Sequence, residues 1–401
     1  MPTVAAVVTR EFKVNTTKLV YSNTPEIANL KDGGYIIAWS NPFFGTAEGS
    51  IRAQRYGPDG ESAGSEIILP VGIQPKLAAL EDGGFVLAYN FYDAATSNAG
   101  LRLLKFKASD QSDFTREVLA TFTDSGQIAG LPNGGYTWLY TTSSGRNLDF
   151  FNKSNQQVAH TAVSNGVAGI APVIFVSADG VVHLVSSDSP ATYPATAGAH
   201  IFEQRFDSTG STLGAPALRV TSPTNAFDLS ASPMADGSYA IAYARSVEAN
   251  EPRTSGVSYT SASAVVAQMF DAAGSPVGSE VVPDLEKGVA QGIRPTNVPR
   301  LTVPCPTPAQ GRPKVLPLQQ GGYVLSWKSP NRPGLQGVRY ESRGTPNSVL
   351  LKLTSTSPDY FEGYAATRAP SSIPVLAWAP PGAEGNGRDI VAKQWPSDGP
   401  R

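Results

Sequence analysis

The chain repeats one short phrase along most of its length. In its full form the phrase reads Asp-Gly-Gly, an aromatic residue, several apolar residues, and then Trp or Tyr. Copies begin at Asp32, Asp82, Asn133, Asp179, Asp236 and Gln320, and a seventh at 373–378 lacks the glycines. Self-similarity of this kind determines the architecture of a chain before any local pattern does, because each repeat is one supersecondary unit. The sequence therefore predicts a repeat fold.

Each repeat contains four short strands joined by turns. An apolar run such as 25–30 precedes the phrase, and an alternating segment such as 51–56 follows it. A glycine turn and a last strand, as in 66–69, complete the unit. Alternation with β-branched and aromatic residues is typical of strands, and no segment has helical periodicity. Repeated units of four antiparallel strands are propeller blades, so we expect an all-β, seven-bladed β-propeller.

Large aromatic residues recur at the end of the phrase. These residues are Trp39, Tyr89, Tyr140, Tyr243, Trp327 and Trp378. A lone four-stranded sheet cannot cover both of its faces, and stacking blades around an axis buries them. We therefore expect these side chains to pack between neighbouring blades.

The chain reads as one propeller domain spanning 1–401. The blades are expected at about 22–70, 71–121, 122–163, 164–221, 222–283, 310–353 and 354–395, with a long insertion at 284–309. The seventh blade stops one strand short, and the missing strand is present at the other end of the chain, within 8–16. We expect this N-terminal segment to pair with 389–395 and close the ring, which removes unpaired sheet edges.

Composition excludes several functional classes. The net charge is −2, so no basic surplus is available to neutralise phosphates, and general nucleic-acid binding is not expected. The single cysteine, Cys305, allows no intrachain disulfide. Apolar runs are too short for a membrane span. The segment 1–13 lacks the pattern of a signal peptide, which predicts a cytoplasmic location or export by a non-classical route.

The repeat resembles one known from large bacterial secreted, adhesin-like proteins. The resemblance rests on the segments 80–85, 53–60 and 64–66. Those proteins often also carry RTX-type calcium-binding nonapeptide tandems. The resemblance implies a β-propeller of bacterial type and no particular activity, because the shared residues are turn glycines and strand cores. This chain contains no Gly-Gly-x-Gly-x-Asp tandem, and 177–180 is only a fragment of a sialidase-type Asp box.

Length variation among the repeats is concentrated in two sets of connections. These join the second strand to the third and one blade to the next, and both sets fall on the same rim of a propeller. Variable loops on a rigid scaffold are where binding usually occurs, so we expect one composite ligand site on that rim. The candidate ligand-binding residues are Phe43, Phe44, Phe91, Tyr92, Asp93, Tyr193, Arg245, Arg294, Arg332, Tyr360, Phe361 and Arg388. Aromatic planes beside Arg and Asp suit sugar rings, and they also suit a protein loop or an anionic small molecule.

Catalytic and metal-binding signals are weak. The histidines His160, His183 and His200 lack the spacing of metal ligands, so no metal site and no cofactor are expected. His183 stands among aliphatic residues of a second strand, where a hydrogen-bonded core histidine is the leading interpretation. The weak catalytic candidates are His200, Glu248, Glu251 and Cys305.

Three functional hypotheses remain open at this point. The first is a lectin-like module that recognises carbohydrate or a cell surface through one composite site. The second is an enzyme, a lyase, hydrolase or isomerase, with a single active site over the central channel. The third is a protein-interaction platform. The expected partner is a glycan or a small molecule, with a protein surface as the further possibility.

Overall fold

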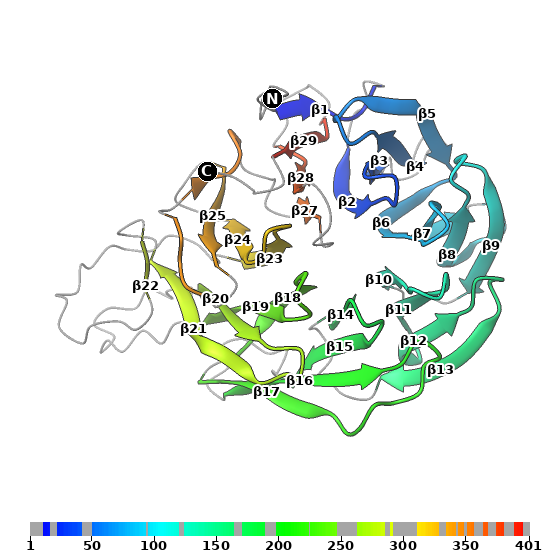
Figure 1. Cartoon of the computed structure of the whole chain (residues 1–401). Coiled ribbons are helices and arrows are strands. Elements are labelled where there is room, and N and C mark those ends of the chain that lie inside the picture. The colour runs from blue at the N-terminus through cyan, green and yellow to red at the C-terminus, as the bar shows by residue number, and fades with distance from the viewer. Residues whose placement is uncertain are drawn as a thin grey trace, which may run out of the picture.

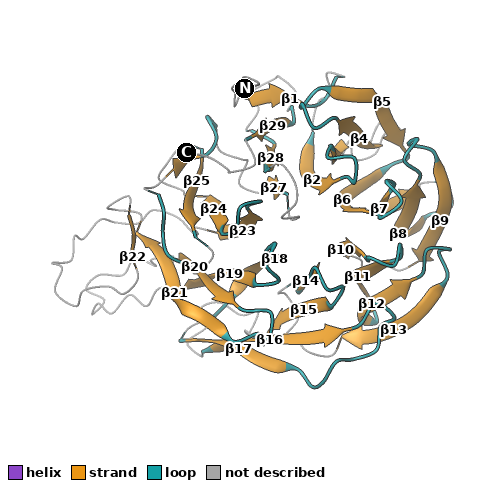
Figure 2. Cartoon of the chain, viewed as in Figure 1, coloured by secondary structure: helices purple, strands orange, loops and turns teal. Residues whose placement is uncertain are grey.

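The computed structural model of the chain is a ring of seven antiparallel sheets, viewed along its axis in Figure 1 and coloured by secondary structure in Figure 2. The structure describes residues 11–16, 22–41, 50–93, 95–119, 124–163, 171–188, 198–223, 225–246, 263–284, 289–291, 311–328, 334–341, 344–348, 351–356, 364–367, 374–380 and 389–395. All regular elements of these residues are strands. The expectation of an all-β, seven-bladed propeller is confirmed.

The blades follow one another along the chain, and within each blade the strands are ordered from the axis outward. Blade 1 contains β2 (Asn23–Asn29), β3 (Tyr35–Asn41), β4 (Ser50–Tyr56) and β5 (Ser62–Leu69), and blade 2 contains β6 (Gly72–Ala79), β7 (Phe85–Asp93), β8 (Asn98–Phe106) and β9 (Ser112–Leu119). Blade 3 contains β10 (Asp124–Gly130), β11 (Tyr136–Thr142), β12 (Gly145–Phe151) and β13 (Gln157–Val163), and blade 4 contains β14 (Val173–Val176), β15 (Val182–Ser187), β16 (Ala199–Phe206) and β17 (Ala217–Ser222).

The remaining blades follow the same order. Blade 5 contains β18 (Phe227–Pro233), β19 (Tyr239–Ser246), β20 (Ser263–Phe270) and β21 (Pro276–Asp284), with β22 (Val289–Gln291) added at its outer edge. Blade 6 contains β23 (Gly311–Pro317), β24 (Tyr323–Lys328), β25 (Leu335–Tyr340) and β26 (Leu351–Lys352). Blade 7 contains β27 (Tyr364–Ala366), β28 (Val375–Trp378) and β29 (Val391–Gln394), and its outer strand is β1 (Glu11–Lys13).

The glycine phrase forms the turn between the first two strands of a blade. In blade 1 the Oδ1 atom of Asp32 accepts a hydrogen bond from the backbone N–H of Gly34 at 2.9 Å. Gly33 has a φ of +86°, in the left-handed region that favours glycine. At Gly34 a Cβ atom would lie 2.3 Å from the carbonyl oxygen of Tyr56. The first glycine therefore permits the turn, and the second permits close approach of the third strand.

The core lies between the blades. The described residues form seven clusters of buried apolar side chains, and each cluster draws its members from two neighbouring blades. Trp39 packs with blade 7 residues such as Ala377, and Trp327 packs with blade 5 residues such as Ala242. Both tryptophans are fully buried. The prediction that the recurring aromatics pack between blades is confirmed for the whole set, Trp39, Tyr89, Tyr140, Tyr243, Trp327 and Trp378.

The N-terminal strand closes the ring. Strand β1 pairs antiparallel with β29, so that Glu11 lies opposite Lys393 and Lys13 opposite Val391. Beyond the strand, the backbone N–H of Val14 donates to the carbonyl oxygen of Ile390 at 2.8 Å. The predicted closure of blade 7 by the N-terminal segment is confirmed, and Figure 1 places β1 beside β29 and next to blade 1.

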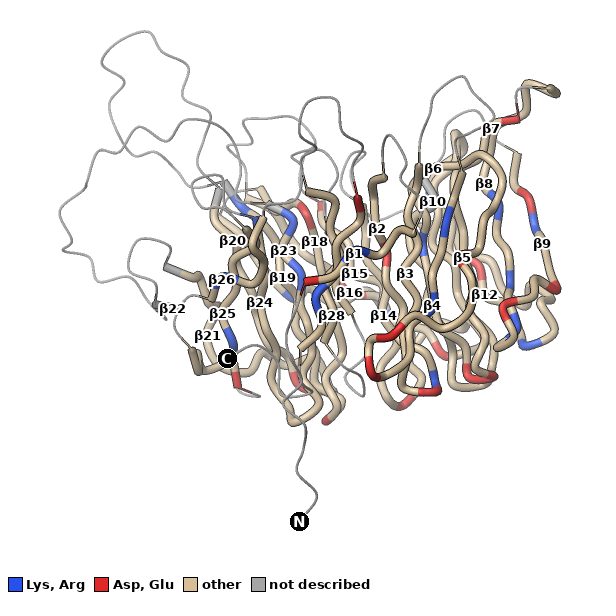
Figure 3. The backbone as a smooth tube through the Cα atoms, turned by 90° about the horizontal axis from the view of Figure 1, so that it is seen from above, with Lys and Arg blue, Asp and Glu red and all other residues tan. Residues whose placement is uncertain are grey.

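Two rims follow from the up-and-down order of the strands. We call the rim that carries turns such as 30–34 and 57–60 the short-turn rim. We call the opposite rim, where the second strand of each blade ends and the third begins, the long-loop rim. Figure 3 shows the ring edge-on as a backbone tube, with many Asp and Glu positions, in red, in the turns of the short-turn rim. Within the described ranges, no helix is long and apolar enough to cross a membrane.

Removing the closing strand is expected to destabilise the whole ring. Deletion of residues 1–16 leaves β29 without its outer partner and exposes the Val14 site in the core between blades 7 and 1. The melting temperature should fall sharply or the protein should aggregate, because an unpaired sheet edge invites association. Deletion of 1–9, which retains β1, is the control and should melt like the full chain. Equal melting of both truncated proteins would contradict the closure by β1.

Candidate functional site

Most of the sequence-predicted site residues lie outside the described residues. These are Phe43, Phe44, Tyr193, Arg294, Arg332, Tyr360, Phe361 and Arg388 among the ligand-binding candidates, and Glu248, Glu251 and Cys305 among the catalytic ones. Of the insertion at 284–309, which holds Cys305, the structure describes Asp284 at the end of β21 and strand β22, which pairs with the outer edge of β21.

Blade 2 carries three of the candidates at the end of β7. The connection between the second and third strands of this blade is a regular hairpin, because β7 continues to Asp93 and β8 begins at Asn98. Phe91 is buried, with the Arg102 guanidinium 4.4 Å from its ring centroid. Tyr92 is 56% exposed. Asp93 accepts hydrogen bonds from the backbone of Ala95 and the hydroxyl of Thr96 within its turn. Tyr92 is therefore the exposed aromatic of this pair.

Arg245 belongs to an ion pair inside its own blade. Its Nη1 atom lies 3.1 Å from Oε2 of Glu280, and the hydroxyl of Tyr243 donates to the other oxygen of the same carboxylate. Blade 2 has a similar arrangement, in which Arg102 pairs with Glu117. An arginine–glutamate pair of this kind is therefore present in both blade 2 and blade 5.

His200 forms a partly exposed pair with Asp188 on the long-loop rim. The two residues stand at the start of β16 and just after β15. The Nδ1 atom of His200 lies 2.8 Å from Oδ2 of Asp188, and the backbone N–H of His200 donates to Oδ1 at 2.5 Å. A carboxylate on Nδ1 fixes the ring orientation and leaves Nε2 for a further partner.

Within the part of the chain that the structure describes, four inner strands carry an extra polar residue where they reach the long-loop rim. The register of each of these strands shifts by a β-bulge against its second strand. The bulged residues are Thr24, Gln74, Asp228 and Arg312, with φ of 45°, 56°, 52° and 58°. Non-glycine residues rarely adopt this backbone conformation, and such strain concentrates at functional sites. We call these four residues the axial lip, because their strands surround the axis in Figure 1.

The axial lip is reachable by solvent and is held by local hydrogen bonds. Gln74, Asp228 and Arg312 are exposed. The Oε1 atom of Gln74 accepts from Asn90 at 2.8 Å, and Oδ2 of Asp228 accepts from the backbone N–H of Arg312 at 2.9 Å. Donors, acceptors and both signs of charge are thus presented around one axis.

The axial lip is not among the residues predicted from the sequence. A signal was present, because Thr24, Gln74 and Arg312 each stand directly before a proline at the same place in the repeat. The residue before proline is restricted to extended backbone, which makes positive φ more unusual there. Only the register of the sheet shows that these residues are bulged.

His183 is a hydrogen-bonded core histidine, as the leading interpretation held. It is 3% exposed and stacks on Phe175, with ring centroids 4.4 Å apart. Its Nδ1 donates to Oε1 of Glu203 at 2.5 Å, and its Nε2 lies 2.9 Å from Oγ of Ser177. The sheet register aligns His183 with Ile36 of blade 1.

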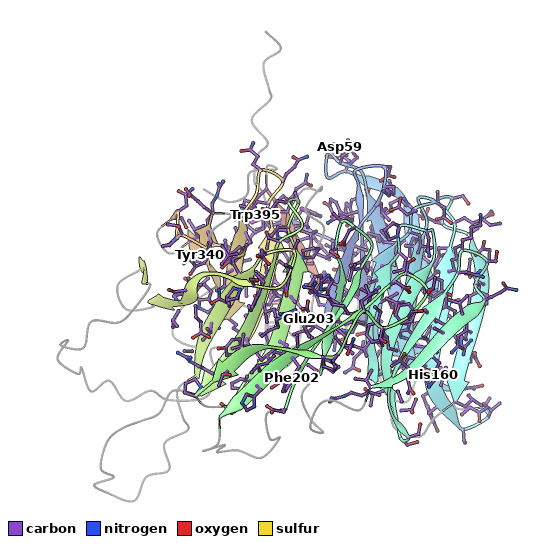
Figure 4. The ribbon with its side chains drawn as sticks, turned by 60° about the horizontal axis from the view of Figure 1, so that its bottom comes forward. Asp59, His160, Phe202, Glu203, Tyr340 and Trp395 are labelled. Carbon is purple, nitrogen blue, oxygen red and sulfur yellow. The ribbon has the colours of Figure 1, made fainter. Side chains whose placement is uncertain are left out.

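Glu203 is the centre of a buried charge cluster. Its Oε2 atom accepts from Arg219 Nε at 2.6 Å, from Arg205 Nε at 3.2 Å and from the Tyr239 hydroxyl at 3.1 Å. Figure 4 shows Glu203 within the body of the ring, away from the rim where Asp59 lies. We call Ser177, His183, Glu203, Arg205 and Arg219 the blade-4 cluster.

The charges around Glu203 outweigh its desolvation. Burial by itself raises the pKa of a carboxyl group, but the hydrogen bonds and charges of His183 and Arg219 lower the pKa of Glu203 from 4.5 to about 2. Blade 1 has Ala53 at the same register position. The sequence signal for this cluster was Glu203 itself, an acid at a position of the alternating segment that is otherwise apolar.

The described residues offer no metal centre, since they contain no group of three or more His, Cys, Asp or Glu side chains arranged to hold an ion.

No family model and no curated protein matches the chain. Among solved structures, the chain is similar to the polysaccharide lyase Uly1 (TM-score 0.55, 10% identity, covering 99% of this chain and 94% of the lyase). It is also similar to the GH93 α-L-arabinofuranosidase of Fusarium graminearum in complex with arabinobiose (TM-score 0.50, 10% identity, 96% and 98% covered). A third similar structure is the β-propeller domain of the Trilobed protease from Pyrococcus furiosus (TM-score 0.52, 7% identity, 94% of each chain covered). At these identities the comparisons show the fold.

Replacing Glu203 should lower stability in a pH-dependent way. Because folding lowers the pKa of Glu203 from 4.5 to about 2, its contribution is complete above pH 4.5 and is lost as the pH falls toward 2. At pH 7, Glu203→Gln should reduce the free energy of unfolding by about 3 kcal/mol. Urea unfolding at several pH values measures the difference between the two proteins, which should shrink as the pH falls from 4.5.

The matched control is Glu117→Gln. Glu117 also pairs with an arginine but is 42% exposed, so the change should cost less than about 1 kcal/mol. A Glu203→Gln difference that stays constant from pH 7 to pH 3 would show that the charge of Glu203 does not stabilise the fold.

Proposed function

We propose that this chain is a carbohydrate-binding propeller with one composite site on the long-loop rim, around the axial lip. The observation that carries the proposal is the set of polar residues in left-handed bulges, Thr24, Gln74, Asp228 and Arg312. Each position puts a polar residue on the innermost strand of its blade, at the long-loop rim, at a cost in backbone strain of typically about 1–3 kcal/mol. Four such positions around one axis suit a ligand with hydroxyl groups on several sides.

The chemistry of the lip fits a sugar better than an apolar ligand. Sugar hydroxyls both donate and accept hydrogen bonds, and the lip offers an amide, a hydroxyl, a carboxylate and a guanidinium. The exposed ring of Tyr92 on the same rim offers an apolar face of the kind on which sugar rings stack. The blades contribute different residues, which favours one composite site over a repeated pocket in each blade.

The similar structures support a carbohydrate ligand. Two of the propellers that this chain resembles along nearly its whole length are a polysaccharide lyase and an arabinofuranosidase bound to arabinobiose. Ligand sites of rigid scaffolds commonly lie in the loops of one end, which agrees with a site on the long-loop rim.

Substitutions in the lip should weaken glycan binding. Screening the protein on a broad glycan array identifies a ligand, and calorimetry then measures its affinity. Gln74→Ala and Arg312→Gln should each weaken binding by about tenfold, because a lost hydrogen bond to a ligand costs about 1–1.5 kcal/mol.

Asp59→Asn, on the short-turn rim, is the control and should bind like the original protein. Absence of any array signal, or equal weakening by Asp59→Asn, would count against a site at the lip.

An enzymatic function is the second candidate, and the His200–Asp188 pair favours it. A histidine oriented by a carboxylate on Nδ1 has the arrangement of a general base. The His200–Asp188 pair lies on the long-loop rim, which is also the rim of the proposed carbohydrate site. A lyase, hydrolase or isomerase reaction would use Nε2 of His200 to take or return a proton.

The two candidates differ in their response to His200→Gln. If the protein turns over the glycan that it binds, this substitution should lower kcat by about 100-fold or more with little change in binding, because general base catalysis contributes about that much. Product analysis after long incubation of the original protein with the bound glycan is the measurement. An unchanged glycan would leave the binding function and exclude the enzymatic one for that ligand.

A further inference from the structure

Blade 4 replaces three apolar residues of the repeat with polar residues that contact one another. Two of them are His183 and Glu203, which stand where blade 1 has Ile36 and Ala53. The third is Ser177, whose backbone N–H donates to the carbonyl oxygen four residues later. In blades 1, 2, 3, 5 and 6 the residues that make this same hydrogen bond are all apolar, namely Leu30, Leu80, Leu131, Met234 and Leu318.

The fold itself does not require these polar residues. Blade 1 fills the same three positions with apolar side chains and forms the same four-stranded sheet. Ser177, His183 and Glu203 are all buried. Buried ionic groups are often no more stabilising than apolar residues of similar volume, because their desolvation offsets their attraction. A role other than holding the blade together is therefore expected for them.

The hydrogen bonds of Ser177 fix where its only hydroxyl hydrogen points. Its Oγ atom lies 2.5 Å from Oδ1 of Asp179 and 3.1 Å from the carbonyl oxygen of Val181. The hydrogen bond from Ser177 is the main cause that lowers the pKa of Asp179 from its usual value, so this carboxyl group is ionised at neutral pH. Carboxylate and carbonyl oxygens only accept hydrogen bonds. The hydroxyl hydrogen therefore points to this side of Ser177.

Both ring nitrogens of His183 must then donate. Its Nε2 atom lies 2.9 Å from Oγ of Ser177, whose hydrogen is already used. Its Nδ1 atom lies 2.5 Å from Oε1 of Glu203, a carboxylate that only accepts. A histidine ring that donates from both nitrogens is an imidazolium ion. Asp179, Ser177, His183 and Glu203 thus form one chain of hydrogen bonds, which we call the blade-4 proton chain.

The charges around His183 agree with a cationic ring. A cavity of about 320 Å³ opens between the β14–β15 turn of blade 4 and the β18–β19 turn of blade 5, and the ring is part of its wall. Three acids and two arginines surround the ring or share this wall, so an imidazolium makes the charges equal. These residues are Asp179, Glu203 and Asp236, and Arg205 and Arg219.

The other neighbours of the ring do not titrate near neutral pH. Phe175 stacks on His183 from β14. Tyr239 of β19 lies with its ring centroid 5.4 Å away, and burial raises the pKa of its hydroxyl above the usual value. The blade-4 proton chain is therefore the part of this interface that gains or loses a proton between neutral and mildly alkaline pH.

We propose that His183 is an imidazolium ion at neutral pH and that the blade-4 proton chain is a pH-sensitive switch in the wall of this cavity. When Nε2 loses its proton, its lone pair faces Oγ of Ser177. The single hydroxyl hydrogen then serves either Nε2 or Asp179, and one of the two hydrogen bonds is lost. The β14–β15 turn is then no longer held to the ring through Ser177.

The same proton positions exclude a nucleophilic role for Ser177 at neutral pH. Serine, histidine and an acid in contact resemble the arrangement that activates a serine in acyl transfer. That chemistry needs a neutral ring which accepts the hydroxyl proton at Nε2. A ring that already donates from Nε2 cannot act as this base.

Nitrogen-15 NMR of the histidine rings tests the proposal directly, because the chain contains three histidines. The two nitrogens of an imidazolium ion have similar chemical shifts, whereas those of a neutral ring differ widely. His160→Gln and His200→Gln each remove one set of signals and so identify those of His183. At about pH 7.5, above the pH of about 6.5 where an ordinary imidazole is half protonated, His183 should give the imidazolium pattern. A neutral pattern would overturn the proposal.

Two variants test whether the chain holds the proton. Ser177→Ala removes the acceptor of Nε2 and should weaken proton binding by His183 about 10- to 100-fold, because hydrogen bonds to charged groups are worth that much. Asp179→Asn removes the distant charge and should weaken it by less. This variant keeps the turn, since Asn133 caps the equivalent turn of blade 3 by accepting from the backbone of Gly135 at 2.9 Å.

Ser154→Ala is the control for these variants. Ser154 is an exposed serine in a turn of blade 3, so its removal should leave the signals of His183 unchanged. If Ser177→Ala and Asp179→Asn are both folded and both titrate at the same pH as the original protein, the proposed chain is wrong.

The stability of the fold provides a second readout. A folded state that holds one proton more than the unfolded chain becomes less stable as the pH rises, and its unfolding equilibrium constant increases up to about tenfold per pH unit. The increase begins near pH 6.5, where histidines of the unfolded chain lose their protons, and ends where His183 loses its own. In Asp179→Asn it should end at a lower pH. Urea unfolding from about pH 6 to 9 measures both profiles, and identical profiles would contradict the switch.

Discussion

The fold depends on burying both faces of every sheet between its neighbours. Each blade has two apolar faces, and the seven core clusters each lie between two blades. A fully buried aromatic such as Trp327 contributes to such an interface, and loss of a side chain of this size typically costs about 3–5 kcal/mol. Because every blade needs two neighbours, the ring must close, and Val14 and the β1 strand complete the last interface.

This constraint decides where polar groups can stand. Between blades, a charge is tolerated only when several partners satisfy it, as four groups do for Glu203. At the rims, which solvent reaches, a charge does not need several protein partners. The two rims differ in structure. The short-turn rim is built from uniform glycine turns, whereas the long-loop rim carries the bulges of the axial lip. Polar residues there face solvent at the end of a rigid strand, so their positions are fixed without a large loss of core packing.

Because the blades repeat, a residue of one blade can be compared with the equivalent residue of another. Arg55 and Arg205 have the same register, yet one is held by Asp110 and the other stands beside Gly274. Comparing equivalent positions of the blades therefore identifies the residues at which one blade differs from the others. The blade-4 cluster is a departure of this kind, because Glu203 stands where blade 1 has Ala53. The resemblance to repeats of large bacterial secreted proteins stays a prediction, since no family model matches the chain.

The sequence alone determined the architecture, because turn glycines, strand alternation and recurring aromatics are local patterns that repeat with the blade. It predicted the seven blades, the packing of Trp39 and its equivalents, and the closure by the N-terminal strand. The site could not be predicted in the same way. Contacts such as Arg205 to Glu203, or the bulge at Gln74, depend on strand register and on which blades are neighbours. Only the tertiary structure brings residues of different blades to one axis or one cavity, because pairing and ring closure, rather than spacing along the chain, set those distances.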